Sequence, residues 1–224
     1  MRSAIFAVLA LLVCGVAMAD NIVIDNPSFE TTNPLNISCG TGCAYNDGPI
    51  PGWTITGAAS GSWMLNSTYY SSPAPDGSIV AYDNGGTISQ TLPGVSLLPN
   101  SIYTLSVYIG DRLDSDFSGY SFSLDAGSTV LSTFSGWNYM IPMGTFQQEF
   151  LTFTTGDSVA AGNLGISLTS NGPQTDFDDV QLNVVPTFQS NGDLVITPEP
   201  STFLLLGMGL FGVLGLTIRR RAEA

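Results

Sequence analysis

The chain of 224 residues contains 18 acidic residues, five basic residues and no histidine, which gives a formal net charge of −13. Between residues 20 and 200 the imbalance is sharper, because 17 acidic residues accompany a single basic one, Arg112. Nucleic acid is excluded as a partner, since phosphate binding needs clustered Lys and Arg. The lack of histidine and lysine also excludes Ser-His-Asp, Cys-His and Ser-Lys catalysis.

The N-terminus has the pattern of a secretory signal peptide over residues 1–19. Arg2 provides the positive charge, residues 5–16 form a nearly unbroken apolar run, and the Ala-Met-Ala sequence before Asp20 matches the small-residue cleavage pattern. The run is too short to span a bilayer, which takes ~20 residues. We therefore expect a signal helix that signal peptidase and the secretion machinery process, and a mature chain that begins at Asp20.

The C-terminal part carries three features in order. They are the tripeptide Pro198, Glu199 and Pro200, an apolar run at residues 203–218, and the arginines Arg219, Arg220 and Arg221. The apolar run predicts a short transmembrane helix, and the arginines place its C-terminal end in the cytoplasm. The body of the protein then lies outside the cytoplasm, in agreement with the signal peptide.

This arrangement closely resembles the PEP-CTERM sorting signal, here at residues 198–224. The resemblance implies recognition by an exosortase, a membrane peptidase, with cleavage near the tripeptide. The two prolines hold the tripeptide extended, which suits a protease substrate. The resemblance also implies a protein that is transiently anchored in the inner membrane and then delivered to the cell surface or the extracellular matrix.

Cysteine usage agrees with export. After removal of the signal peptide two cysteines remain, Cys39 and Cys43, in a glycine-rich Ser-Cys-Gly-Thr-Gly-Cys loop. An oxidising compartment favours a disulfide between them, which would close only a short loop and stabilise it locally. A zinc site is the alternative, but it would need ligands beyond these two cysteines, and the chain has no histidine.

Short β-rich runs separated by turn residues fill residues 20–185. The run at residues 102–109 alternates between apolar and polar residues, which is the period of a half-buried strand. Ten strands are predicted, at residues 21–24, 53–56, 78–82, 87–92, 102–109, 120–124, 130–134, 146–153, 164–168 and 180–185. The Asp-Asn-Gly-Gly sequence at residues 83–86 predicts a hairpin. The spacing predicts an all-β fold, an antiparallel β-sandwich of the jelly-roll type, followed by a linker at residues 186–197.

The order of these pieces resembles the carbohydrate-binding modules with a galactose-binding-like jelly-roll fold. The likeness rests on Asn-Pro-Ser-Phe-Glu at residues 26–30, Pro-Gly-Trp at residues 51–53 and Phe-Asp-Asp-Val-Gln-Leu at residues 177–182. It implies a structural calcium ion held by Glu30 and by Asp178 or Asp179. Strand adjacency favours the same site, because the first and last strands of a jelly roll can lie side by side and adjacent carboxylates need a cation or a proton. Solvated acidic residues at strand ends are the alternative.

Aromatic residues in exposed loops are the candidates for stacking on sugar rings. Tyr69, Tyr70, Trp137 and Tyr139 lie in stretches flanked by Gly and Ser, which are typical of such loops. Trp53 lies in one of the family-like motifs and is expected in the core. For each of the other four, packing in the core or within its loop is the alternative to ligand contact.

The acidic loop at residues 111–116, Asp-Arg-Leu-Asp-Ser-Asp, lacks the glycine and glutamate of an EF-hand, so a solvated loop with one surface ion pair is expected. We interpret the chain as an exported, non-catalytic module that binds extracellular polysaccharide. A structural protein of the envelope or biofilm matrix, without a specific glycan ligand, is the alternative. A glycan-active enzyme is a more distant one, because acidic residues are abundant but no pair is marked as catalytic.

Overall fold

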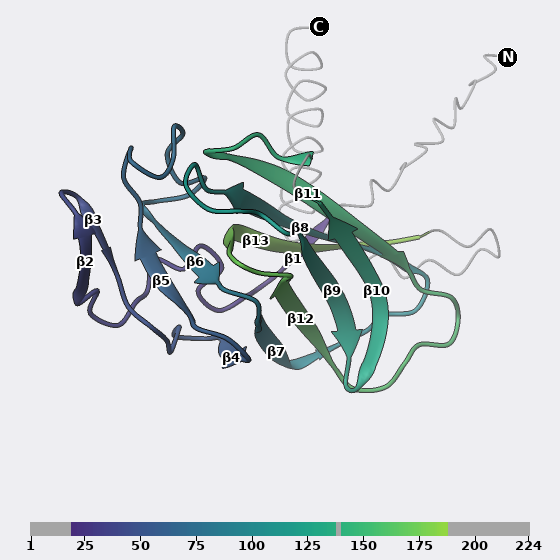
Figure 1. Ribbon diagram of the computed structural model, residues 1–224. Coiled ribbons are helices and arrows are strands. Elements are labelled where there is room, and N and C mark those ends of the chain that lie inside the picture. Colours follow the sequence, from purple (N-terminus) through teal and green to yellow (C-terminus); the bar gives the residue numbers. More distant parts are fainter. Residues whose placement is uncertain (1–18, 138–139, 188–224) are drawn as a thin grey trace, which may run out of the picture. The chain divides into compact units, whose positions relative to one another are not determined.

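Figure 1 shows a computed structural model of the chain, which describes residues 19–137 and 140–187. This part of the chain forms thirteen β-strands, all paired antiparallel, and no helix in it is long and apolar enough to cross a membrane. The all-β prediction is therefore confirmed. The predicted signal helix and membrane helix lie outside the described residues.

The strands belong to two sheets (Figure 1). The larger sheet has the order β11-β8-β13-β6-β5-β3-β2, with β1 also paired to β13, and the smaller has the order β10-β9-β12-β7-β4. The bounds are β1 (Asp20–Ile22), β2 (Ile37–Gly40), β3 (Cys43–Tyr45), β4 (Thr54–Thr56), β5 (Ser60–Met64), β6 (Ile79–Asp83), β7 (Thr87–Ser96), β8 (Ser101–Asp111), β9 (Tyr120–Ala126), β10 (Thr129–Gly136), β11 (Thr145–Thr154), β12 (Asn163–Ser170) and β13 (Thr175–Pro186).

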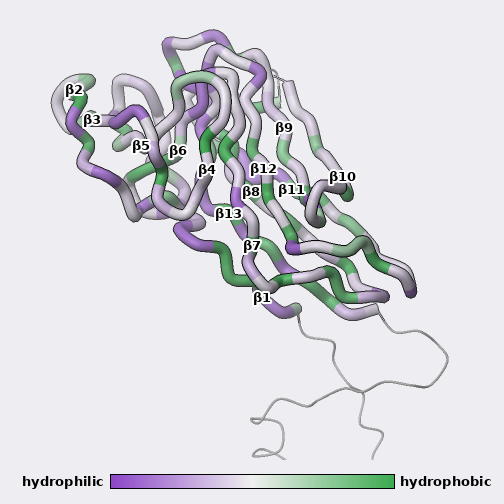
Figure 2. The backbone as a smooth tube through the Cα atoms, turned by 90° about the horizontal axis from the view of Figure 1, so that it is seen from below, coloured by the Kyte–Doolittle hydropathy of each residue, from purple (hydrophilic) through white to green (hydrophobic). Residues whose placement is uncertain are grey.

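The main hydrophobic core takes side chains from both sheets. Strand β8 directs its alternate apolar residues into this core, where none of them is more than 1% exposed: Tyr103, Leu105, Val107 and Ile109. Strand β12 of the smaller sheet buries Leu164, Ile166 and Leu168 in the same core. Figure 2 shows hydrophobic stretches recurring along the strands of both sheets. Burial of each Leu or Ile contributes about 1.5–3 kcal/mol to the stability of the fold. Burial of the apolar residues at alternate strand positions is therefore the main interaction that holds the two sheets together.

One predicted connection is wrong. Strands β6 and β7 do not form a hairpin, because β6 pairs with β5 and β13 while β7 pairs with β12 and β4 in the other sheet. The turn between them therefore leads from one sheet to the other. The reason is the buried Asp83, whose carboxylate accepts hydrogen bonds from Ser60 Oγ at 2.7 Å, from Gly86 N at 2.8 Å and from Ser170 N at 3.1 Å.

A second, smaller hydrophobic cluster forms on the larger sheet, around β3, β5 and β6. Its buried members are Cys43, Trp63, Tyr70, Val80 and Tyr82. The predicted disulfide is confirmed, and it joins Cys39 on β2 to Cys43 on β3. Strands β2, β3 and β5 were not predicted, because each is short and none shows an apolar alternation. They nevertheless build the wall of the candidate site.

Candidate functional site

A cavity of about 350 Å³ opens against the second hydrophobic cluster. Strands β2, β3, β5 and β6 and five connecting segments, which follow β3, β5, β6, β8 and β12, contribute its lining. The lining residues are Ser38, Cys39, Tyr45, Asp47, Trp63, Tyr69, Tyr82, Asn84, Arg112 and Gln174. An adjacent hollow of about 490 Å³ shares Asp47 but is lined otherwise by Asn, Pro, Gly and Ile residues. The cavity of about 350 Å³ is the better candidate for the functional site, because aromatic walls with a few polar groups are typical of small-molecule sites.

The aromatic walls are held by contacts between neighbouring strands and by the disulfide. Tyr45 on β3 lies opposite Trp63 on β5 in the register, and its ring contacts Tyr82 edge-on at 5.9 Å between centroids. Trp63 contacts Tyr69 at 5.2 Å. Trp63 Nε1 donates a hydrogen bond to Cys43 Sγ at 3.2 Å, and the Tyr69 hydroxyl donates to the carbonyl of Cys39 at 3.3 Å. The disulfide loop therefore fixes two of the rings.

Arg112 forms the charged part of the cavity wall. Its guanidinium carbon lies 4.8 Å from the ring centroid of Trp63 and 4.9 Å from that of Tyr69, which are cation–π distances. Its Nε and Nη2 atoms donate to the two carboxylate oxygens of Asp114 at 3.0 and 3.1 Å, and Nη1 donates to Gln174. The predicted ion pair in the acidic loop is confirmed. The prediction that the whole loop is solvated is wrong, because the side chain of Asp111 is buried. Arg112, the only basic residue between positions 20 and 200, lines the cavity.

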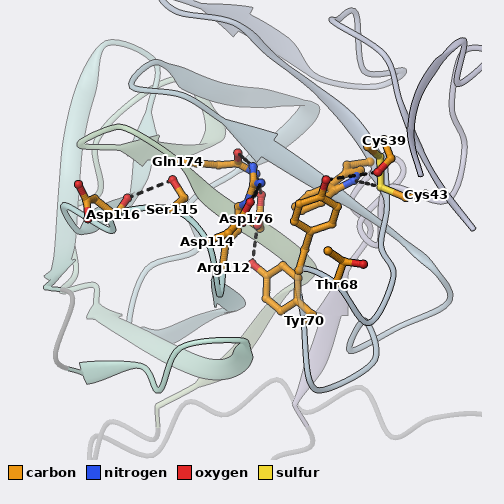
Figure 3. A network of polar contacts seen from close by, with 12 residues as sticks. Cys39, Cys43, Thr68, Tyr70, Arg112, Asp114, Ser115, Asp116, Gln174 and Asp176 are labelled. Carbon is orange, nitrogen blue, oxygen red and sulfur yellow. Dashed lines mark hydrogen bonds and ion pairs between the residues drawn. A yellow bond between two sulfur atoms is a disulfide. The ribbon is translucent and has the colours of Figure 1, made fainter. Parts of the chain in front are cut away.

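A buried carboxyl group, Asp176 on β13, lies beside Gln174 and Arg112, which line the cavity (Figure 3). The Tyr70 hydroxyl donates to its Oδ2 atom, and Gln174 Nε2 donates to its Oδ1 atom at 2.7 Å. Asp176 is fully buried, and this burial raises its pKa to about 7 although the hydrogen bonds from Tyr70 and Gln174 act in the opposite direction. A carboxyl group with such a pKa holds a proton at neutral pH for part of the time and can transfer it.

A second perturbed carboxyl group belongs to Asp111, at the end of β8. Its side chain is 3% exposed, its Oδ1 atom has no hydrogen-bond partner in the described part of the chain, and burial raises its pKa to about 6. It also acts electrostatically on Tyr70 and Asp176, raising the pKa of both. Burial raises the pKa of Asp176 most, Asp111 adds to this increase, and the Arg112 guanidinium acts in the opposite direction.

The four aromatic residues that were predicted to contact a sugar do not form one site. Tyr69 lines the cavity, whereas Tyr70 is buried below it and stacks on Phe146 at 4.5 Å between centroids. Trp137 is 55% exposed between β10 and β11 and is not among the lining residues. Tyr139 lies outside the described residues. Trp53 is buried in the main core, as expected.

The predicted calcium ligands do converge on one segment. Glu30 Oε1 accepts hydrogen bonds from the backbone of Ser78 at 2.7 Å and of Ile79 at 2.6 Å, and Asp178 Oδ2 accepts one from Asp76 N at 3.0 Å. Burial raises the pKa of Asp178 to about 8. Asp179, by contrast, accepts a hydrogen bond from Gln181 on the exposed side of the strand. Among the described residues no group of three Asp, Glu, Cys or His side chains is placed to hold a metal, so the calcium site stays a prediction.

Fold and site together define an all-β domain with a buried acid beneath an aromatic cavity. The model of the HpiC1-like family, described as HpiC1 cyclase, matches residues 20–183, and the PEP-CTERM protein-sorting motif matches residues 197–221. The chain belongs to the HpiC1-like cyclase family. The predicted sorting signal is confirmed, and it identifies an exported protein that is processed by an exosortase.

Solved cyclase structures from Fischerella are similar over nearly their whole length. An apo cyclase from Fischerella sp. is 29% identical, with a TM-score of 0.65, and the match covers 76% of this chain and 98% of that one. A cyclase from Fischerella sp. TAU in complex with 4-(1H-indol-3-yl)butan-2-one is 30% identical, with a TM-score of 0.64, covering 76% and 100%. A Stig cyclase of the same strain, in complex with (3Z)-3-(1-methyl-2-pyrrolidinylidene)-3H-indole, gives the same values. A comparison with curated proteins finds no match.

These findings overturn two predictions, that the chain is a non-catalytic carbohydrate-binding module and that it is not an enzyme. The lack of histidine and lysine excludes the Ser-His-Asp, Cys-His and Ser-Lys arrangements but not proton transfer by a buried carboxyl group. Of the aromatic residues predicted to stack on sugar rings, Tyr69 is a wall of the cavity. A jelly-roll likeness indicates a fold, and a fold does not fix a ligand.

Proposed function

We propose that the domain is an exported enzyme that closes a ring in an aromatic small molecule, with Asp176 as the proton donor. The observation that carries this proposal is a fully buried carboxyl group, hydrogen-bonded by Tyr70 and Gln174, directly behind a cavity walled by aromatic rings. Its raised pKa supports the same role, because a donor works best when its pKa lies near the working pH. Membership of a cyclase family supports the type of reaction.

The reaction needs no oxidant and no cofactor. The Asp176 proton adds to a π bond of the substrate, a second π bond of the same molecule attacks the resulting cation, and a carbon–carbon bond forms. Loss of a proton from the product back to the carboxylate restores the acid, so the product is an isomer of the substrate. Arg112 lies over Trp63 and Tyr69, so the rings of Tyr45 and Tyr82 are the cavity walls that stabilise the passing positive charge.

Gln174 separates Asp176 from the cavity. It lines the cavity, donates to Asp176 Oδ1 and accepts from Arg112 Nη1. Rotation of its side chain on substrate entry would bring the acid into contact with the ligand. Tyr70 keeps the carboxyl group in place from the other side, through its hydrogen bond to Oδ2, and is therefore a positioning residue.

An indole-like body is the substrate class that we propose. The two Fischerella complexes contain indole compounds, and a cavity of about 350 Å³ lies within the range of small-molecule sites. A bicyclic aromatic ring can stack on the tyrosine and tryptophan walls at little entropic cost, because the walls are already packed.

Incubation of the purified full chain with a panel of 3-alkenylindoles tests the function. Proton transfer to the alkene starts ring closure, so we expect a product of unchanged mass and new chromatographic retention, which mass spectrometry detects. Saturable binding of 4-(1H-indol-3-yl)butan-2-one should accompany it. The variant Asp116→Asn, in the exposed acidic loop, serves as a matched control that keeps both. A folded protein that neither binds the ketone nor forms any isomer would rule the proposal out.

Calcium remains part of the proposal as a structural ion. Glu30 and Asp178 would hold it with the backbone of residues 76–79, since hard oxygen ligands suit calcium. A bound ion present at 100 times its Kd adds about 2.7 kcal/mol. We therefore expect a chelator to lower the melting temperature by roughly 5–10 °C, and Glu30→Gln to remove most of this difference. Identical melting curves with and without chelator would contradict the site.

A jelly roll is the topology that we propose for the fold. Strands β6 to β13 divide into two sets of four, with the orders β6-β13-β8-β11 and β7-β12-β9-β10. Consecutive strands in this series change sheet except at β9 and β10, which pair with each other, and this order supports a double Greek key. The sorting motif supports delivery to the cell surface or the extracellular matrix.

A further inference from the structure

We propose that Arg112 selects substrates that carry a carboxylate group next to the aromatic body. This inference rests on the proposed function, because it takes the aromatic cavity as the substrate site. It starts from the charge distribution. In a segment with 17 acidic residues the single basic residue lines this cavity, and a surface position would serve solubility equally well.

The guanidinium group is held rigidly. Its central carbon lies over the rings of Trp63 and Tyr69, Nε and Nη2 form two hydrogen bonds with Asp114, and Nη1 donates to Gln174. A donor that is already ordered loses little entropy when a ligand binds to it. Arg112 is therefore pre-organised for recognition.

The hydrogen bonds leave a matched pair of donors. A guanidinium group carries five N–H bonds, one on Nε and two on each terminal nitrogen. Asp114 takes the Nε donor and one Nη2 donor, and Gln174 takes one Nη1 donor. One N–H therefore remains on each terminal nitrogen, and the side chain keeps 21% of its surface exposed. Two donors on the terminal nitrogens of one planar group can meet the two oxygens of a carboxylate.

Neighbouring acids set the strength of this recognition. Asp114 shares the guanidinium charge, and Asp47 lines the same cavity, where it accepts a hydrogen bond from Tyr82. Both reduce the attraction for an anion. Replacing Asp114 with Asn should therefore tighten the binding of a carboxylate, which is the opposite of the result expected from a merely structural role for the ion pair.

Three isosteric indoles provide the test, measured by calorimetry on the full chain at constant pH and 0.15 M salt. They are 4-(1H-indol-3-yl)butan-2-one, 3-(1H-indol-3-yl)propanoic acid, in which O⁻ replaces the ketone methyl group, and the neutral 3-(1H-indol-3-yl)propanamide. Because charge-assisted hydrogen bonds are about twice as strong as neutral ones, we expect the acid to bind about tenfold more tightly than the ketone. The amide should bind like the ketone.

Arg112→Gln should abolish the preference, because it weakens binding of the acid about tenfold more than binding of the ketone. Arg112→Lys, which keeps the charge but not the fork, should retain part of the preference. Asp114→Asn should raise the preference, and Asp116→Asn is the control with the same charge change. Melting curves check that each variant is folded.

Equal affinities of wild type for acid and ketone would overturn the inference and leave the proposed function standing. A preference that survives Arg112→Gln would also overturn it. Absence of binding by all three ligands would overturn the inference, and the proposed function would fall with it only if the alkenylindoles also gave no isomer.

Discussion

Replacing Asp176 with Asn should stabilise the protein at pH 8 and leave its stability unchanged near pH 4. Asp176 is fully buried, and this burial raises its pKa from 3.8 to about 7. Between these two values the unfolded chain releases the proton and the folded chain keeps it. Folding stability therefore falls as the pH rises from about 4 to about 7, and does not change further above the folded pKa.

The size of this change in stability follows from the difference between the folded and unfolded pKa values of Asp176. One pKa unit corresponds to about 1.4 kcal/mol, so Asp176 alone accounts for a loss on the order of 4 kcal/mol over this pH range. Asn is uncharged at every pH and resembles the protonated carboxyl group in shape. The variant loses this pH dependence but keeps the share that comes from Asp111 and Asp178, whose pKa values are also raised by burial.

Chemical unfolding of wild type and variant at pH 4, 6 and 8, with a chelator present, measures the difference. Asp116→Asn, a solvent-exposed position in the same protein, should follow wild type at each pH. Parallel stability curves for wild type and Asp176→Asn would show that the carboxyl group is not held neutral by the fold. The same variant should form product at background level while still binding the ketone, because it keeps the cavity and loses the proton.

Much of the fold is predictable from period-two patterns. Strands β8, β11 and β12 begin and end within one or two residues of their predicted bounds, because alternate apolar residues enter a core on one face only. The turn after β6 has hairpin chemistry and yet connects two sheets. Its outcome depends on the buried carboxylate of Asp83 and on Ser170, which is 87 residues away in the chain. Local sequence carries no signal of that contact.

The candidate site was harder to predict for a related reason. Asp176, Asp178 and Asp179 are the same residue type within four positions, so the sequence does not distinguish them. The pairing of β13 with its neighbouring strands decides which of the three are buried. A β-bulge near Asp179, where φ is +45°, shifts the alternation, so Asp176 and Asp178 are buried while Asp179 meets an exposed glutamine. The unique position of Arg112 was a usable signal, since a single cation among 17 acids needs an explanation.

The cavity also depends on backbone packing that no side chain reveals. Gly61 on β5 lies against residues 46–48, where a Cβ atom would overlap the carbonyl oxygen of Asn46 and lie 2.9 Å from Gly48 N. Two hydrogen bonds hold this segment to β5, from Asn46 N to Ser62 O at 3.0 Å and from Gly48 N to Ser60 O at 2.6 Å. The cavity residue Asp47 lies between them.

Gly61→Ala should therefore be strongly destabilising. The added methyl group meets backbone atoms that cannot rotate away, so both hydrogen bonds must lengthen, and the cost should be roughly 3–5 kcal/mol. For a domain of this size this corresponds to a fall in melting temperature of roughly 10 °C. Ketone binding should weaken as well, because displacement of Asp47 opens the wall beside Tyr82.

Gly156→Ala is the matched control. It adds the same methyl group in a loop where no atom lies within 4 Å of the new Cβ, so the melting temperature should stay close to that of wild type. The φ angle of neither glycine lies in the left-handed region, which makes the contact with residues 46–48 the difference between the two variants. Equal melting temperatures for both would mean that the segment carrying Asp47 does not rest on β5. The aromatic cavity would then lack the rigid wall on which ring closure in a confined site depends.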